Sequence, residues 1–392
     1  MLKLPSNFST SIDELLKLQN THTIFLSSWD KGIENLDFPN EIIKPAVAKF
    51  PEFKNEYLFS DELDEYKRKL LTYFDTPIGE DASSRFGIFP NGTTAAMIAI
   101  ASIKGIVSTI RALLIAPTYF TYIKVLRDFD SDIRYISAKI SGIETDLNLE
   151  MIKLGLRQDK INMVILTVPF FGTGISITKE QITTLCDLCN QHNCYLLIDY
   201  MYGGMPWKTS EENPSQWLWR LSTRYPLVII IESLSKRVFL NGIKSATAIS
   251  TPSFIKQMEI NSVHLAGSMS YVQLTLLNHL MSKENQIFVK SQIDKNVQSF
   301  QQNYEIIKAY TIGTPIHLCP CKEGYFCLAK LSNHSLPSME MSKKILTTSN
   351  VLTIPHDRYL YFTPNEYAFR VNLSMKKETL ISGLRQLLEI YL

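Results

Sequence analysis

The stretch ESLSKRVFLNGIKSA, residues 232–246, places polar side chains directly after the apolar run PLVIIIES. Two lysines lie eight positions apart, Lys236 and Lys244, and the hydroxyl residues Ser233 and Ser235 precede the first of them. A lysine amine can bind an anion, and when it is desolvated it can act as a nucleophile or a base. A lysine in such a loop is also commonly a solvated charge, so the stretch alone leaves both interpretations open.

Other polar residues also follow apolar runs. Asp199 lies near the end of the run CYLLIDY and Tyr202 comes three positions later, while Tyr119 comes shortly after the run RALLIAP. Each has a simpler interpretation, since an aspartate at a strand end commonly caps the next helix. The segment NGTTAA, residues 91–96, can likewise begin a helix, with glycine in the turn and threonine as the cap. The order of these features along the chain, more than any one of them, favours a binding site.

The elements that must position these residues lie between residues 88 and 250, where short apolar runs alternate with longer amphipathic stretches. Apolar runs without alternation are typical of strands buried on both faces of a parallel sheet. One stretch between them predicts a helix that begins at Thr178, with Gln181 three positions on as in a capping box. Strands that alternate with helices predict an α/β domain whose ligand lies at the carboxyl ends of the strands. The expected strands are residues 111–117, 161–169, 194–200, 226–233 and, more weakly, 245–251.

The pattern changes after about residue 285. A long helical stretch comes first, at residues 285–310, and no internal repeat or flexible linker separates it from what precedes. Three segments that suit a small half-exposed sheet follow, at residues 325–331, 350–355 and 367–375. We therefore expect a large α/β domain at residues 46–285 and a smaller α+β domain formed by residues 1–45 and 286–392.

Composition and charge exclude several classes of function. The chain has 392 residues, of which 45% are hydrophobic and 20% charged, as in ordinary globular proteins. The formal net charge is only +2 and no long basic run is present, so nucleic-acid binding has no electrostatic support. No window approaches the roughly 18 consecutive apolar residues of a membrane helix, and the N-terminus is polar and amphipathic. A cytoplasmic protein without a membrane partner is expected.

Six cysteines raise the question of a metal site, because Cys186 and Cys189 have the spacing CDLC. A zinc site would need two such pairs at matched separation, which the sequence does not offer. This pair lies in a predicted helix, where cysteine behaves as a small buried hydrophobe. Reduced core thiols and no bound metal are expected.

The whole ordered set resembles a known family. It comprises a Gly-Thr-Thr helix start, a Pro-x-Tyr, a Pro-x-x-Gly-Thr-Gly turn, an Asp-x-x-Tyr, a Ser-x-Ser-Lys with a basic residue eight positions on, and a late arginine. In this it is similar to the fold-type I pyridoxal 5'-phosphate enzymes, specifically the class I/II aminotransferases, over roughly residues 25–392. The resemblance implies a large domain with a mostly parallel seven-stranded sheet between helices, plus a smaller α+β domain. It also implies pyridoxal 5'-phosphate as cofactor.

The resemblance assigns a role to each residue around the cofactor ring. Lys236 would form a Schiff base with the cofactor aldehyde and later move the α-proton of the substrate, and a lowered pKa suits both roles. Asp199 would lie beside the pyridine nitrogen and keep it protonated, so that the ring can accept electrons. Tyr202 would bond the phenolic oxygen of the ring, and Tyr119 would stack on its face.

The phosphate of the cofactor would be held at the other end. The resemblance implies that the backbone N–H groups of Gly92, Thr93 and Thr94 bind it at a helix N-terminus, where the helix dipole favours an anion. Ser233 and Ser235 would add hydroxyl groups.

Three further residues complete the implied site. Lys244 stands where the family usually has arginine, so it can neutralise the phosphate without the planar two-pronged geometry. Tyr57 resembles the tyrosine that reaches the phosphate of the neighbouring subunit, which implies a homodimer. Arg370, with its apolar flanking residues, matches the arginine that binds the substrate α-carboxylate, although a strand arginine at the surface is the alternative.

One position departs clearly from the family pattern. In VPFFGTG, Phe171 stands where the family typically has an asparagine that bonds the phenolic oxygen of the cofactor. Without that donor, we expect the Schiff base at Lys236 to stay protonated to higher pH than in ordinary members.

The reaction is expected to be transfer of an amino group between an amino acid and a 2-oxo acid. Because Phe171 and Lys244 differ from the residues usual in the family, a second hypothesis stays open. It is a cofactor-dependent oxidase or hydroxylase, cyclase or lyase in a specialised biosynthetic pathway. A third is a non-catalytic ligand-binding relative, which the intact set of Asp199, Tyr202 and Lys236 disfavours. Side-chain specificity is not readable. The segment FLSSWDKGIENLDF contains three candidate pocket residues, Trp29, Asp30 and Glu34, for which solvated surface positions are the favoured alternative.

Overall fold

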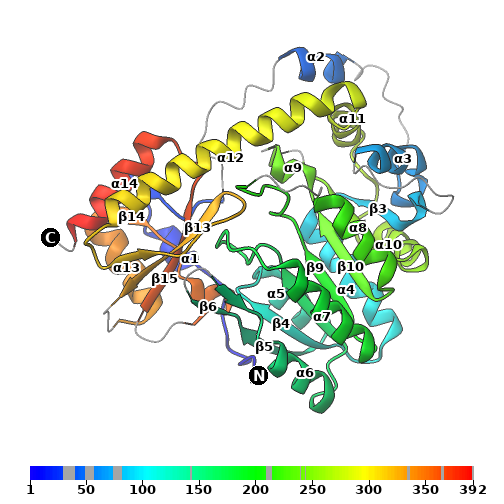
Figure 1. Cartoon of the computed structure of the whole chain (residues 1–392), viewed down its shortest axis with the longest axis horizontal. Helices are drawn as coiled ribbons and strands as arrows, with labels where there is room; N and C mark the ends of the chain where they lie inside the picture. Colours follow the sequence, from blue (N-terminus) through cyan, green and yellow to red (C-terminus); the bar gives the residue numbers. More distant parts are fainter. Residues whose placement is uncertain are drawn as a thin grey trace.

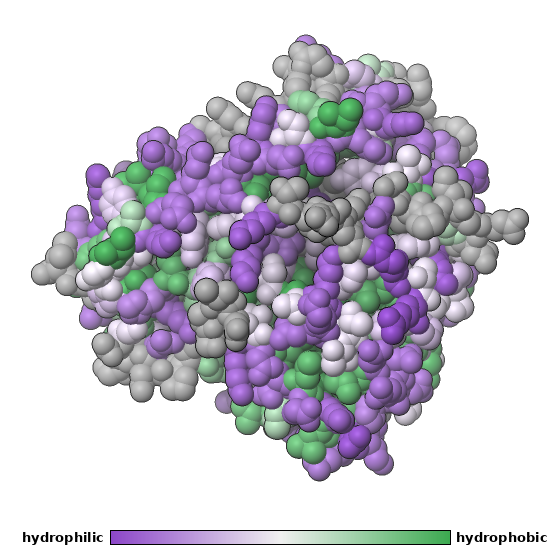
Figure 2. Space-filling view, in the orientation of Figure 1, coloured by the Kyte–Doolittle hydropathy of each residue, from purple (hydrophilic) through white to green (hydrophobic). Residues whose placement is uncertain are grey.

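The computed structural model describes most of the chain, and α/β layers are its main feature (Figure 1). Among the described helices, none is both long enough and apolar enough to cross a membrane. The surface in one view is largely hydrophilic with small separate hydrophobic patches (Figure 2). The described residues are 1–29, 40–48, 57–73, 82–141, 144–208, 214–238, 240–242, 244–332, 336–362 and 366–390.

The large sheet has the strand order β1-β5-β4-β8-β9-β10-β11-β3. The central strands from β5 to β10 are parallel, whereas β11, β3 and β1 pair antiparallel at the two sides. The predicted architecture is confirmed, but the sheet has eight described strands where seven were expected, because the N-terminal β1 adds an edge strand. The bounds are β1 Leu2–Lys3, β3 Phe86–Phe89, β4 Arg111–Ala116, β5 Asp132–Ser137, β8 Met163–Thr167, β9 Tyr195–Asp199, β10 Val228–Glu232 and β11 Ala246–Ile249.

Helices cover both faces of this sheet, which is why its strands are apolar without alternation. One core lies between the sheet and α4, α5 and α10, and the other between the sheet and α3, α6, α7, α8 and α11. The helix predicted from Thr178 is confirmed, since the Thr178 hydroxyl accepts the N–H of Gln181 at the start of α7. The bounds are α3 Asp64–Tyr73, α4 Gly92–Ile106, α5 Thr121–Asp128, α6 Leu149–Gln158, α7 Lys179–Gln191, α8 Pro214–Arg224, α9 Leu234–Arg237, α10 Pro252–Leu265 and α11 Tyr271–Leu280.

The C-terminal part begins with the long helix α12, Lys283–Thr311, which runs from α11 to α14 (Figure 1). Its small sheet has the order β12-β13-β15, and a separate parallel pair is formed by β14 and β2. The prediction that residues 350–355 join one sheet with the other two segments was only partly right, since β14 pairs with the N-terminal strand β2 and a single bridge joins Pro355 to Phe369 of β15. The bounds are β2 Ile24–Phe25, β12 Ile316–Leu318, β13 Phe326–Ser332, β14 Val351–Leu352, β15 Glu366–Asn372, α13 Ser338–Ser349 and α14 Lys377–Glu389.

The remaining described elements are short. A two-stranded hairpin, β6 and β7, lies outside the large sheet. All six cysteines are buried and unpaired, as expected for core thiols, and no group of metal-ligand side chains occurs in the described part of the chain. The bounds are β6 Lys139–Ser141, β7 Glu144–Asp146, α1 Asp13–Lys17 and α2 Asn40–Ala48, with 3-10 turns at Ser60–Glu62, Ser83–Arg85 and His356–Tyr359.

Candidate active site

A cavity of about 180 Å³ lies at the carboxyl ends of the central strands. The segments that follow β3, β4, β9 and β10 all contribute to it, which is the place where open α/β sheets bind ligands. The structure therefore brings the motifs around Gly92, Tyr119, Asp199 and Lys236 to this edge, while residues 168–174 do not line the cavity. The lining residues are Asn91, Gly92, Thr93, Tyr119, Tyr122, Asp199, Met201, Tyr202, Ser235, Lys236, Asn241, Lys244 and Ser245.

Asp199, the last residue of β9, lies at one end of the cavity and is almost fully buried. Its carboxylate accepts the backbone N–H of Met201 at 3.1 Å and the hydroxyl of Tyr122 at 3.0 Å. Burial raises the pKa of the Asp199 carboxyl to about 6, although both hydrogen bonds oppose the shift. A cationic group bound in the cavity would stabilise the ionised carboxylate, so this end of the cavity suits a protonated ring nitrogen.

Lys236 lies in the single helical turn α9, which follows β10 directly. The lysine lines the cavity, and its Nζ lies 5.6 Å from the centre of the Tyr202 ring. The sequence pattern explains this placement, because the buried strand β10 ends at Glu232 and the chain turns into the cavity edge immediately afterwards. Lys236 and Asp199 are thus brought to the same cavity by adjacent strands, β10 and β9.

The start of α4 forms another part of the cavity wall. The cap is Asn91 and not a threonine as expected, since the Asn91 side chain accepts the N–H of Thr94 at 2.9 Å. That bond occupies Thr94, so the first N–H groups of the helix, at Gly92 and Thr93, are the ones that a bound anion can use. Lys244 also lines the cavity and adds positive charge.

The two serines of the Ser-x-Ser-Lys motif differ in position. Ser235 lines the cavity, whereas Ser233 lies behind it and donates its hydroxyl to the carbonyl of Ser245 at 2.6 Å. The two serine hydroxyls are themselves 2.6 Å apart. Because Ser233 uses its hydrogen on the Ser245 carbonyl, Ser235 is the donor between the two serines. Ser235 lines the cavity, but its hydroxyl must rotate away from Ser233 to donate to a bound anion.

Arg370, on β15, is fully buried beside the cavity edge. Its Nε and Nη2 both donate to the carbonyl of Ser27, at 3.0 and 2.8 Å, while Nη1 is buried without a hydrogen-bond partner. Unpaired buried polar atoms are rare and need an explanation. The Nη1 edge of the guanidinium is suited to a carboxylate, which would satisfy it. The surface alternative for Arg370 is wrong, because the side chain is 0% exposed.

Aromatic rings enclose this arginine. The guanidinium carbon lies 4.7 Å from the Phe326 ring centre, 4.9 Å from that of Trp29 and 5.6 Å from those of Phe171 and Tyr359. Phe171 also contacts Tyr119 and Tyr202, with ring centres 5.1 and 5.9 Å apart. The residue that departs from the family pattern is thus inside the site, where it contributes an apolar ring and no hydrogen-bond donor.

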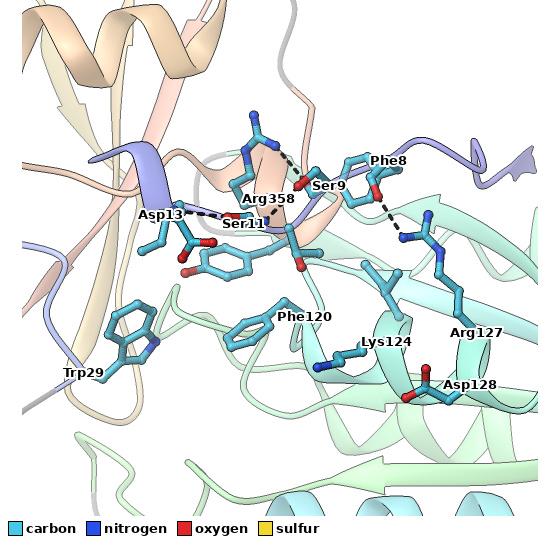
Figure 3. Close-up of a pocket in the computed structure, with 14 residues that line it drawn as sticks. Phe8, Ser9, Ser11, Asp13, Trp29, Phe120, Lys124, Arg127, Asp128 and Arg358 are labelled. Carbon is cyan, nitrogen blue, oxygen red and sulfur yellow. Dashed lines mark hydrogen bonds between the residues drawn. The ribbon is translucent and has the colours of Figure 1, made fainter. Parts of the chain in front are cut away.

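A second cavity, of about 470 Å³, adjoins these rings (Figure 3). Trp29, Phe120 and Tyr359 line it, with Asp13 and Trp29 on one side in the view and Lys124 and Asp128 on the other. Trp29 therefore lies in a pocket, as suggested for the specificity segment. The other two candidates from that segment, Asp30 and Glu34, lie outside the described residues.

Tyr57 does not reach the cavity of its own chain. Its side chain is 77% exposed and stacks on Phe59, with ring centres 6.0 Å apart. An exposed aromatic ring is the expected state of a residue that a second subunit would cover, but its role stays a prediction.

Sequence reasoning missed several residues of the cavity. Tyr122, in the first turn of α5, bonds Asp199, and its place shortly after the apolar run that forms β4 is the signal that could have indicated it. Asn241 lines the cavity with a buried, unpartnered Oδ1 atom, and Ser245 also lines it. No local sequence signal distinguishes these last two from ordinary loop residues.

The sequence pattern of a known family covers most of the chain. The family described as aminotransferase class I and II matches residues 35–387. An aspartate aminotransferase from Pyrococcus horikoshii is 20% identical over 234 residues, which cover 57% of this chain and 55% of that protein. A histidinol-phosphate aminotransferase from Methanosphaera stadtmanae is 24% identical over 276 residues, 70% of this chain and 68% of that protein. The alignment thus spans about half the length of the first relative and two thirds of the second.

Solved structures share the fold over nearly the full chain. An Escherichia coli protein described with a methionine aminotransferase function superposes with a TM-score of 0.81 at 15% identity, covering 99% of both chains. An aromatic aminotransferase from Pyrococcus horikoshii gives a TM-score of 0.82 at 14% identity, covering 97% of this chain and 98% of that one. At these identities the likeness establishes the architecture.

Proposed function

This chain belongs to the class I and II aminotransferase family, whose members depend on pyridoxal 5'-phosphate, and from that premise we propose that it is itself an aminotransferase. It would move an amino group between an amino acid and a 2-oxo acid. The observation that carries the proposal is one cavity whose wall contains Lys236, the buried Asp199 and the start of α4.

The lining residues fit the cofactor at both ends. Asp199 is buried among neutral donors, so a protonated pyridine nitrogen supplies the positive charge that its carboxylate lacks. Gly92 and Thr93 offer backbone N–H groups for the phosphate, and Lys244 offers a cation. Asn241 has a buried unsatisfied atom at this end, and an amide in either orientation can bond a bound group there. When bound, the cofactor supplies an aldehyde that accepts an amine and a ring that withdraws electrons from the substrate.

The residues of this chain would supply attachment, orientation and proton movement. Lys236 provides the amine for the cofactor aldehyde, and the same amine moves the proton at the substrate α-carbon. Arg370 binds the substrate α-carboxylate through its unpartnered Nη1 edge and so fixes that carbon over the cavity. Phe171 and Tyr359, both buried, exclude water from the space around the guanidinium.

The active unit would be a homodimer. Tyr57 is 77% exposed in the single chain, and we infer that it reaches the cofactor phosphate of the partner subunit. The side chain of the substrate would extend toward the cavity lined by Trp29, Phe120 and Tyr359, which adjoins Arg370 through two of those rings.

A second candidate reaction is favoured by one observation. Phe171 packs within the site without a donor for the cofactor's phenolic oxygen, and this alters control over the electron-rich state that the ring stabilises. The candidate is an oxidase or hydroxylase, cyclase or lyase that uses the same cofactor on an amino acid.

A half-reaction separates these candidates. Purified protein loaded with pyridoxal 5'-phosphate is mixed with each of a panel of amino acids under anaerobic conditions while its absorbance is recorded. An aminotransferase loses the visible band of the lysine-bound cofactor, and a 2-oxo acid then restores it. The second candidate is supported by a bleached form that no 2-oxo acid restores, or by oxygen uptake in a parallel aerated sample. No spectral change with any amino acid contradicts both.

A further inference from the structure

An ion pair brackets the reactive lysine. Arg237 follows Lys236 directly at the end of α9, and its Nη2 donates to the Oε2 atom of Glu232 at 2.6 Å. Glu232 is the last residue of β10, so the pair ties the end of the lysine-bearing turn to the strand before it. Both side chains are buried, with 6% and 1% of their surfaces exposed. The six-residue segment from Glu232 to Arg237 is thus closed by a buried charged contact.

The same guanidinium binds the loop that carries the cavity tyrosine. Arg237 Nε donates to the carbonyl of Gly203 at 3.1 Å, one residue after Tyr202. Gly204 adopts a φ of +76°, and a Cβ atom there would lie 2.5 Å from Arg237 Nε. The glycine is therefore required for the guanidinium to lie this close to the loop. Arg237 holds two separate segments of the site in a fixed relation.

A second carboxylate extends this contact to the C-terminal part of the chain. Glu323, between β12 and β13, accepts the N–H of Gly204 at 2.8 Å and the hydroxyl of Tyr200 at 3.3 Å through one oxygen. Its other oxygen accepts the hydroxyl of Ser176 at 2.7 Å. Glu323 itself is only 7% exposed. The loops after β8, β9 and β10 are all anchored to this network of two carboxylates and one guanidinium.

The cost of burying these charges calls for a role other than stability. Burial alone would lower the pKa of the Arg237 guanidinium, and Glu232 reverses this and holds the pKa above its usual range. A buried ion pair commonly stabilises a fold no better than apolar residues of the same size. Its specific gain is fixed geometry, because a guanidinium offers donors in a rigid planar arrangement. Here the guanidinium of Arg237 fixes the position of Lys236 relative to Tyr202.

The geometry points to Arg237 as the positioning residue of Lys236, with Glu232 as its anchor and Glu323 as the anchor of the loop at Gly203 and Gly204 that Arg237 binds. Through these contacts the turn α9 keeps the lysine amine at the cavity and beside the Tyr202 ring, which is 5.6 Å from Nζ. Arg237 does not line the cavity, and so it acts through its neighbour. This inference rests on the proposed function of Lys236 as the amine that binds the cofactor.

The test compares two substitutions of Arg237 with a matched control elsewhere. Arg237→Lys keeps a cation for Glu232 but has no second donor fixed toward Gly203, and Arg237→Met removes the charge. The control is Lys67→Met, which breaks the buried pair of Lys67 and Glu259, whose side chains are 5% and 4% exposed and which lies outside the cavity lining. Unfolding midpoints of all three variants are measured beside their chemistry.

The reactivity of Lys236 distinguishes the two roles, because it would not change if Arg237 only stabilised the fold. The full-length protein without cofactor is treated briefly with acetic anhydride, and labelling of Lys236 is measured by mass spectrometry relative to the exposed Lys124. We expect the labelling ratio to change at least threefold in both Arg237 variants and to stay unchanged in Lys67→Met, even where the loss of stability is similar. In the loaded enzyme, kcat should fall at least tenfold in Arg237→Lys with KM changed less than twofold.

Each other outcome overturns the inference. A labelling ratio equal to wild type in Arg237→Lys, which retains the buried charge and is the variant expected to fold, shows that Arg237 does not position the lysine. An equal change in the Lys67→Met control shows a general effect of lost stability. Failure of the proposed function is distinguishable, because borohydride treatment of the loaded wild-type protein would then leave no reduced adduct on Lys236 whatever the variants do.

Discussion

At the residue scale, Asp199 is the group whose charge depends most on what the cavity holds. Its carboxylate has two neutral donors, Met201 N–H and the Tyr122 hydroxyl, and burial raises its pKa to about 6. A carboxyl whose folded pKa is raised stabilises the fold at low pH and loses that contribution as the pH rises through the folded pKa. The buried ionised carboxylate is therefore a cost to the protein without cofactor, and a bound cation reverses it.

Asp199→Asn should consequently stabilise the cofactor-free protein at neutral pH. The rise from the ordinary value of 3.8 to about 6 corresponds to a gain of at most about 3 kcal/mol above pH 7. The advantage over wild type should widen by about 1 kcal/mol between pH 5 and pH 8, measured by urea unfolding at each pH. An advantage that shrinks with rising pH would contradict the assignment. In the loaded enzyme the same variant should lose activity by about 100-fold or more, because the ring nitrogen is no longer kept protonated.

Phe171 stands where the resemblance to the family leads us to expect an asparagine. We expect the Schiff base at Lys236 to stay protonated to higher pH than in family members with an asparagine here, because the phenolic oxygen of the cofactor would keep the Tyr202 hydroxyl but lose the asparagine donor. Phe171→Asn should restore the donor and lower the spectroscopic pKa of the Schiff base by about one unit. Absorbance titration of wild type and variant from pH 5 to pH 10 measures this. A variant pKa equal to or above that of wild type would rule out the effect.

Single residues of the site were predictable only where they follow a strand or begin a helix that the sequence pattern indicates. Lys236, Asp199 and Tyr202 follow buried strands, and the structure brings them to one cavity. Arg237 and Glu323 gave no signal, since charged residues in a sequence read as solvated unless their partners are known, and these partners come from segments far apart in the chain. Thr94 was assigned to the phosphate, but its N–H is bonded by the Asn91 cap.

At the element scale, the start of α4 decides how the phosphate end of the cavity is built. Asn91 fixes the first turn by accepting the N–H of Thr94, so that the preceding N–H groups point outward from the helix end. The strand β3 before it and the helix of 15 residues after it hold this end rigidly at the sheet edge. The element therefore supplies both a dipole and oriented donors.

Asn91→Ala should weaken cofactor binding through this element. Loss of the cap costs about 1 kcal/mol of stability, and the disordered first turn should bind the phosphate less well. Affinity for pyridoxal 5'-phosphate should fall several-fold, while that for pyridoxal, which has no phosphate, should change little. The matched control is Thr178→Ala, which removes the cap of α7. It should lower stability similarly and leave the cofactor affinity unchanged; a fall in pyridoxal affinity equal to that for the phosphate ester would refute the role of the helix start.

Strands and helices were predictable where the sequence itself showed an apolar run or a helical period. They were not predictable where only pairing with a distant segment defines them. The apolar runs at 111–117, 161–169, 194–200, 226–233 and 245–251 correspond to β4, β8, β9, β10 and β11. β14 was misassigned because a two-residue strand has no periodicity to indicate its partner, and its pairing with β2 joins segments over 300 positions apart. β1 was missed for the same reason.

At the scale of the whole molecule, we propose the division into a large part at residues 46–285 and a smaller part formed by residues 1–45 and 286–392. β1 is an exception within this division, since it pairs with β5 of the large sheet. Glu323 joins the two proposed parts through its bonds to Gly204 and Ser176. The exposed Tyr57 is the residue that extends the site to a second subunit.

Shared sites in a homodimer predict complementation between inactive subunits. Lys236→Ala and Tyr57→Ala should each lower activity strongly on their own. When the two variants are unfolded together and refolded as a mixture, hybrid dimers would contain one site with both residues intact, and about a quarter of all sites should recover. Activity of the mixture is compared with that of each variant treated alone, with size-exclusion chromatography to confirm dimers. No recovery in dimeric hybrids would show that Tyr57 acts within its own subunit or not at all.

The central claim is that Lys236 is the amine to which the cofactor binds covalently. Wild-type protein is loaded with pyridoxal 5'-phosphate, reduced with borohydride, digested and mapped by mass spectrometry, with Lys236→Ala treated in parallel. The proposed function predicts a reduced pyridoxyl adduct on Lys236 in the wild type and none on any residue of the variant at equal occupancy. An adduct that maps instead to Lys244, or equal labelling of both proteins, would contradict it.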